Sequence, residues 1–194
     1  MSPTRCTARL VVSACLLALI APAVAVRGSG AAARAPERLR LSAPFDLTRG
    51  AVRDTNGDGL PDSVVARVIV PALPASEEVE AAANISARLA YETTALTLPL
   101  VVRDDQVPQP AEIQLPILVG RDNAFVKKLA DRGAIDLKTL KAGQGLVAVV
   151  DSPLGGPDGI LVVGGDGAGT LAAAVELPAR LPRLWSMSGI TIAG

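Results

Sequence analysis

The chain of 194 residues contains no histidine and only two cysteines, Cys6 and Cys15. The lack of histidine excludes a Ser-His-Asp triad, a Cys-His pair and the usual zinc sites. Both cysteines lie in a segment that we expect to be removed, so the mature part has no disulfide and no thiolate chemistry. Aromatic residues make up only 2% of the chain. The core therefore has to be built from Val, Leu, Ile and Ala, and a surface that stacks sugars would have few side chains to use.

There is also no excess of charge of one sign. Without residues 1–25 the chain has 17 basic and 19 acidic residues, a net charge of about −2. This balance gives no electrostatic reason to bind nucleic acid or an anionic membrane. We expect no nucleic-acid partner, and no membrane contact after the signal has been cleaved.

Residues 1–25 have the layout of a secretory signal peptide. Two arginines precede a nearly unbroken apolar run of about 17 residues, 10–26, which closes on Ala23-Val24-Ala25. That small-x-small pattern is what signal peptidase accepts. A membrane span needs roughly 20 apolar residues, which disfavours an anchor. Val12-Ser13-Ala14-Cys15 resembles a lipobox, but it precedes the bulk of the apolar run instead of ending it. We expect cleavage and a secreted or periplasmic protein, with an Ala-, Gly- and Pro-rich composition typical of a high-GC bacterial genome.

The mature chain divides into a leader and one domain. Residues 26–40 are rich in Ala, Gly and Arg without apolar periodicity, which predicts a flexible leader. Residues 41–194 suit a single α/β domain with its own core. Apolar periodicity and turn residues predict its elements. Strands are expected at Ser63–Val70, Leu96–Leu100 (at a sheet edge), Ile113–Val119, Leu146–Val150 and Ile160–Val163, and helices at about Ser76–Ala90, Ala124–Arg132 and Ala168–Leu181.

These elements mix without strict βαβ alternation. The sequence therefore predicts an α+β fold: a mixed sheet with two to three helices packed on it, preceded by a β-hairpin. The two strands at 146–150 and 160–163 are joined by a short Gly- and Pro-rich turn, which favours an antiparallel pair.

The polar loop of the first hairpin, 54–62, has the spacing of a calcium loop. Calcium takes six or more hard oxygen ligands in a flexible shell. Two glycines, at 57 and 59, let the chain wrap an ion, and the loop resembles those of dockerins, thrombospondin-type repeats and FG-GAP-type repeats. It departs from an EF-hand at two positions. Val65 stands where an EF-hand has an acidic residue, and Pro61 stands where it has an apolar residue. The alternative is a turn that holds no ion. The predicted ligands are Asp54, Asn56, Asp58, Leu60 (through its carbonyl) and Asp62.

Two further motifs favour structural roles. The turn 164–170 follows a strand and opens a helix, where phosphate is often bound. It matches neither the dinucleotide fingerprint nor the P-loop, and Asp166 would repel phosphate. Tight strand-to-helix packing is the better interpretation. Asp104 and Asp105 could form an acid-base pair, but adjacent carboxylates in a Pro-rich loop are usually solvated.

From Ala81 onward, the order of "AAANISARL", "TTALTLPLVV", "LPILVGRDN", "LKAGQGLVAVV" and "GILVVGGDGAGTLAAAVELPARL" resembles a family. It is similar to the small α/β domain that precedes the barrel in β-hexosaminidases, α-glucuronidases and related glycosidases. A weaker similarity is to flavodoxin-like domains of the periplasmic regulatory subunit of bacterial cellulose synthase. The glycosidase domain is non-catalytic, so the resemblance implies no catalytic residues, and a downstream catalytic domain or an extracellular polysaccharide assembly as partner.

Three functions compete. The first is a secreted, non-catalytic accessory domain of a carbohydrate-active or cell-surface protein, with a calcium-stabilised loop. The second is a small secreted binding protein, and the third is a hydrolase that uses carboxylates alone. The first is favoured, with calcium as the expected cofactor and no catalytic residues within this chain.

Overall fold

The computed structural model describes residues 46–48 and 50–180. The predicted signal peptide, the leader and the last residues of the predicted domain, 181–194, lie outside the described residues. All described residues belong to one compact unit. Its strands are β1 (Val52–Arg53), β2 (Ser63–Val64), β3 (Ala66–Val70), β4 (Val101–Arg103), β5 (Leu115–Val119), β6 (Gly145–Val150) and β7 (Gly159–Gly164), and its α-helices are α1 (Ser76–Tyr91), α2 (Ala124–Asp131) and α3 (Gly167–Arg180). Three short 3-10 helices lie at Asp104–Gln106, Pro110–Glu112 and Leu137–Thr139.

Five of these strands form one sheet in the order β4-β3-β5-β7-β6. The first four run parallel, whereas β6 is antiparallel to β7. The strands β1 and β2 form a separate antiparallel hairpin. The α+β fold, the mixed sheet, the helices packed on it and both predicted hairpins are therefore confirmed.

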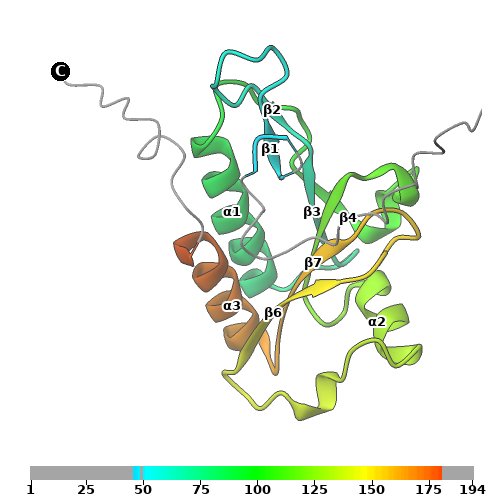
Figure 1. Cartoon of the computed structure of the whole chain (residues 1–194). Helices are drawn as coiled ribbons and strands as arrows, with labels where there is room; N and C mark the ends of the chain where they lie inside the picture. The colour runs from blue at the N-terminus through cyan, green and yellow to red at the C-terminus, as the bar shows by residue number, and fades with distance from the viewer. Residues whose placement is uncertain (1–45, 49, 181–194) are drawn as a thin grey trace, which may run out of the picture. The chain divides into compact units, whose positions relative to one another are not determined.

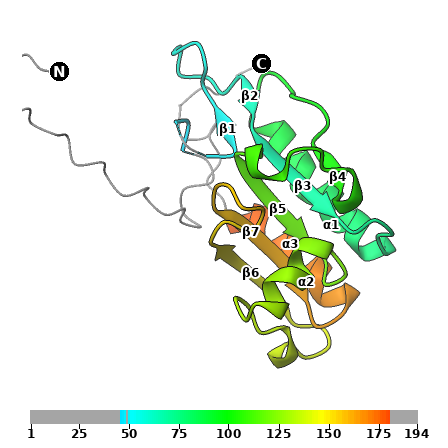
Figure 2. The ribbon, with the colours of Figure 1, turned by 90° about the vertical axis from the view of Figure 1, so that its right-hand side faces the viewer.

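Helices cover both faces of this sheet. Figure 1 shows α1 and α3 side by side on one face and α2 on the other, and Figure 2 shows the order of the strands from a second direction. Neighbouring residues of one strand consequently enter different cores: Val68 packs toward α1 and α3, and Ile69 toward α2. A strand buried on both faces has to be continuously apolar, as β5 and β7 are.

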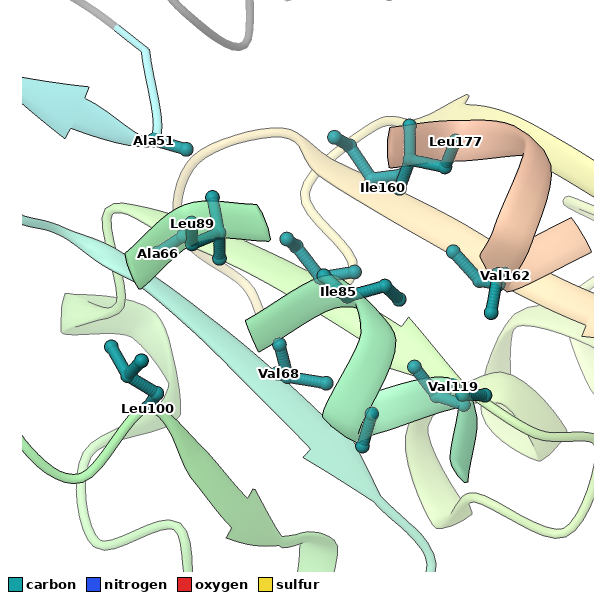
Figure 3. Packing of buried hydrophobic residues seen from close by; sticks show 14 of the residues in the cluster. Ala51, Ala66, Val68, Ile85, Leu89, Leu100, Val119, Ile160, Val162 and Leu177 are labelled. Carbon is teal, nitrogen blue, oxygen red and sulfur yellow. The ribbon is translucent and has the colours of Figure 1, made fainter. Parts of the chain in front are cut away.

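The larger core lies between the sheet and the pair α1–α3. Ile85 of α1 lies above Val68, Leu89 of α1 lies beside Ala66, and Leu177 of α3 lies near Ile160 (Figure 3). These side chains are at most 5% exposed. Because helices and sheet bury this apolar surface together, the positions of α1 and α3 follow from their apolar stripes.

Two predicted strands differ from those observed. The segment 63–70 forms two strands, because Val65 and Ala66 donate their N–H groups to Ala51 where the chain leaves the hairpin and enters the large sheet. The predicted edge strand over 96–100 is displaced: β4 begins only at Val101, whose partner is Val68 of β3. Pro99 has no N–H to donate, so pairing starts after it.

Polar groups and a glycine mark the ends of the helices. Asn123 caps α2, since its Oδ1 accepts the N–H of Phe125 at 2.9 Å. Gly133, with φ +72°, follows the end of α2, where a glycine is common. Ser76 does not cap α1: the N-cap residue is Ala75, whose N–H donates to Glu78 Oε2 at 2.9 Å.

Candidate functional site

The predicted calcium loop connects β1 to β2 and folds around the carboxylate of Asp54. One oxygen of Asp54 accepts the N–H of Gly57 at 2.6 Å, and the other accepts the N–H of Gly59 at 2.8 Å. Both glycines have positive φ, +79° and +87°, a conformation that brings their N–H groups inward. These N–H groups, that of Gly59 above all, lower the pKa of Asp54.

The other predicted ligands bond within the same loop. Asn56 Oδ1 accepts the N–H of Asp58 at 2.9 Å, and Asp58 Oδ1 accepts the N–H of Leu60 at 2.8 Å, so both residues form Asx turns. Asp62 lies across the loop, where both of its oxygens accept the hydroxyl of Thr55. The loop therefore closes through side-chain bonds to its own backbone and hydroxyl groups.

Calcium binding by this loop stays a prediction. Within residues 46–48 and 50–180, no three His, Cys, Asp or Glu side chains are gathered as a metal-binding group. Each carboxylate oxygen in the loop accepts one or two hydrogen bonds, and an oxygen with one bond still has a lone pair for a cation. Asp54, Asn56 and Asp58 lie in one exposed turn, whereas Asp62 is bonded to Thr55 across the loop.

The glycine-rich turn between β7 and α3 is packed against backbone, as predicted. A Cβ at Gly164 would overlap the backbone of Gly169 and Thr170, and one at Gly165 would overlap that of Lys141. The carboxylate of Asp166 accepts the N–H of Gly169 at 2.8 Å and caps α3. Since this carboxylate occupies the helix N-terminus, the turn is not built to receive a phosphate.

The two adjacent aspartates have separate structural roles. Asp104 Oδ2 accepts the N–H of Ala124 at 2.6 Å, at the start of α2. Asp105 forms an ion pair with Arg103 at 3.0 Å. Neither carboxylate faces the other across a cleft, which agrees with the structural interpretation.

A buried carboxylate that sequence reasoning missed lies where β3 and β5 end. Glu78 is 7% exposed and lies against Gly120, whose lack of a Cβ leaves room for it. Burial raises the pKa of Glu78, and the negative charges of Asp122, Glu77 and Asp104 add to this effect. The signal in the sequence is the glycine at the end of a buried strand, but nothing in the sequence pairs it with Glu78.

A groove between α1 and α3 was also not predicted. Its volume is about 530 Å³. Tyr91 and Val175, 62% and 52% exposed, lie on its two sides. The described residues that line it are Asn84, Ala87, Arg88, Tyr91, Val175 and Pro178. None of these described residues is a carboxylate.

The α/β domain matches a known family. The model of the S-layer like family, outer domain, matches residues 77–181, which is more than half of the 194 residues. The chain belongs to this family. None of the curated proteins matches this chain. A member of the S-layer like family is a secreted or cell-surface domain, which agrees with the export predicted from residues 1–25.

The family match covers only part of the described domain. It begins in α1 and runs through α3, so it leaves out the hairpin with the calcium-type loop and the strand β3. The family model that matches is this one and not that of the glycosidase domains expected from the sequence. None of the helices in the described part of the chain is long and apolar enough to span a membrane.

Proposed function

We propose that the chain is a non-catalytic accessory domain of a cell-surface protein, exported through residues 1–25 and presented outside the cell as part of a surface assembly. The family match over α1 to α3 is the observation that supports this most strongly. The carboxylates of Asp104 and Asp105 give secondary support, since they bond to structural partners. A polysaccharide or a carbohydrate-active enzyme is the partner that the glycosidase resemblance implies.

Surface exposure is the direct test. An antibody raised against the purified chain should label intact cells, and protease added outside should remove the label. A Leu16→Arg, Leu17→Arg variant, which interrupts the apolar run of the signal, should keep the chain inside. Labelling only after lysis contradicts the proposal. Turnover of chromogenic glycosides or esters by the pure chain would favour the hydrolase instead.

We also propose that the hairpin loop binds calcium. Asp54 and Asp58 lie in one exposed turn with Asn56, wrapped by two glycines of positive φ, and a cation would offset the repulsion between the two carboxylates. Binding to the folded state alone stabilises it by about 2.7 kcal/mol when free calcium is 100 times the dissociation constant. Extracellular calcium modules bind at about 0.1 to 1 mM.

Several millimolar calcium should therefore raise the melting temperature of the chelator-treated chain, and magnesium should do so much less. Asp58→Ala should abolish the difference while the fold is kept, because the α/β core lies elsewhere. Asp105→Ala removes an exposed aspartate outside the loop and serves as the matched control. Equal melting temperatures with and without calcium in the unmodified chain would show that the loop is only a turn.

A further inference from the structure

The chain has three asparagines, and their surroundings differ. Asn123 is fully buried and caps α2, whereas Asn84 lies in the middle of α1 and is followed by the β-branched Ile85. Asn56 is exposed, lies in the loop between β1 and β2 and is followed by Gly57. Asparagine is one of the thermolabile residues of proteins, because its side-chain amide can be attacked by the backbone nitrogen of the next residue. Such an attack needs an accessible amide and an unhindered nitrogen. Of the three asparagines, Asn56 has both.

The backbone nitrogen of Gly57 is sterically open. Glycine carries no side chain beside this nitrogen, and a Cβ placed at Gly57 would meet no atom outside its chain neighbours within 4 Å. Attack on Asn56 closes a five-membered imide, which changes the backbone dihedral angles on both sides of the new ring. Glycine permits angles that other residues cannot adopt. The ring can therefore close without displacing a neighbouring group.

Two hydrogen bonds hold the side chain of Asn56 over the peptide that follows it. Its Oδ1 accepts the N–H of Asp58 at 2.9 Å, and its Nδ2 donates to Asp58 Oδ2 at 3.1 Å. The first bond closes an Asx turn, whose ring contains both the side-chain carbon Cγ of Asn56 and the nitrogen of Gly57. The same N–H would stabilise negative charge that develops on Oδ1 during the attack. The carboxylate of Asp58 lies beside the amide nitrogen that has to leave.

The nitrogen of Gly57 also has a base within reach. Asp54 Oδ1 accepts its N–H at 2.6 Å, a distance at which a carboxylate can take up the proton. The pKa of Asp54 is lowered, chiefly by the N–H of Gly59, so its carboxylate is ionised at neutral pH. A nucleophile, a base and a donor to the developing oxyanion are thus held together in one exposed loop.

We propose that Asn56 is a site of spontaneous deamidation and that the folded loop promotes the reaction. The nitrogen of Gly57 forms a bond to Cγ of Asn56, while its proton passes through Asp54 to the amide nitrogen, which leaves as ammonia. Water then opens the succinimide at either carbonyl and gives aspartate or isoaspartate. Either product adds one negative charge to the loop, and isoaspartate also lengthens its backbone by one carbon atom. This inference depends neither on the proposed surface function nor on calcium binding.

Peptide mapping by mass spectrometry measures the reaction directly, because trypsin places each asparagine in a fragment of its own. These fragments are 54–67, 68–88 and 122–127. The purified chain is incubated at neutral pH with a chelator, which keeps the loop free of calcium, and is sampled over time. Fragment 54–67 should gain the mass difference between an amide and an acid and separate into two products of equal mass. The fragments with Asn84 and Asn123 should stay unchanged.

A synthetic peptide with the sequence of residues 52–64 separates the effect of the folded loop from that of the sequence alone. Asn56 should convert several-fold faster in the folded chain than in this peptide, because the folded loop holds Asp54 and Asp58 in place. Asp54→Ala should slow the conversion in the folded chain and leave the rate in the correspondingly altered peptide unchanged. Asp54→Glu keeps a carboxylate and should restore part of the rate. Asp105→Ala removes an exposed aspartate outside the loop and is the matched control, with no expected change.

Two results would overturn the proposal. One is a fragment 54–67 that stays unmodified in the folded chain, or that converts no faster than the peptide, since the loop would then protect Asn56 or have no influence on it. The other is a folded chain in which Asp54→Ala and Asp105→Ala convert at the same rate, which would show that Asp54 takes no part in the reaction.

Discussion

Glu78 is a carboxylate held between a glycine and a helix start. Its Oε2 accepts the N–H of Ala75 at 2.9 Å, and its side chain fills the space left by the missing Cβ of Gly120. The hydrogen bond favours the ionised form, whereas burial disfavours it more, and the pKa is raised. Holding Glu78 at the helix start therefore costs more free energy when its carboxyl group is ionised than when it is protonated.

The pH dependence of stability should show this. A folded-state pKa above the unfolded value of about 4.5 means that folding favours the protonated form. The contribution of Glu78 is thus present below pH 4.5 and is lost as the pH rises through the folded pKa. For one group the slope cannot exceed about 1.4 kcal/mol per pH unit.

Glu78→Gln should remove this fall in the free energy of unfolding between pH 4.5 and neutral pH, measured by denaturant titration at a series of pH values. Glu77→Gln, which removes the neighbouring charge, should leave most of it. The loss of stability at low pH should be the same in Glu78→Gln as in the unmodified chain. It arises from Asp54 and Asp166, whose pKa values are lowered and whose contribution to the free energy of unfolding is lost only below about pH 3.8. An identical slope in Glu78→Gln and the unmodified chain would contradict this assignment.

At the scale of elements, local pattern predicted most of the fold. The apolar stripe of α1 and the continuous apolar runs of β5 and β7 are each set by residues close together in sequence, and these elements were placed to within about two residues. Strand β4 was misplaced because its register is set by β3, more than 30 residues earlier. The alternation of Leu96, Leu98 and Leu100 is real, but the first two are exposed and lie before the strand.

Some features of the candidate sites could also be predicted from the local sequence, and others could not. The turn around Asp54 was predictable, because its hydrogen bonds join residues at most five positions apart. The packing of Gly164 and Gly165 was predictable from composition and position. The groove and the burial of Glu78 were not, since they arise where α1 meets α3 and where β3 ends beside β5. Such juxtapositions depend on strand order, which the sequence pattern leaves open.

At the scale of the whole molecule, the family match and the folding unit do not coincide. The match begins at residue 77, but β3, which ends at Val70, lies between β4 and β5 and pairs with both. In the described sheet β4 is paired with β3, so without β3 it has no strand beside it. The side chains of Val68, Ile69 and Val70 are at most 5% exposed and contribute to both cores.

A chain that starts at residue 77 should therefore fail to fold, although it contains the whole matched region. Burying the side chains of Val68, Ile69 and Val70 stabilises by about 1.5–3 kcal/mol each, or roughly 5–9 kcal/mol together. That is a large part of the 5–15 kcal/mol by which a typical domain is stable. Thermal unfolding followed by circular dichroism should be cooperative for chains 41–194 and 63–194, the latter keeping β3 without the calcium-type loop, and absent for 77–194. A cooperative transition in 77–194 would mean that β5, β6 and β7 with their helices form an independent unit, and that β3 is added to a sheet that is stable without it.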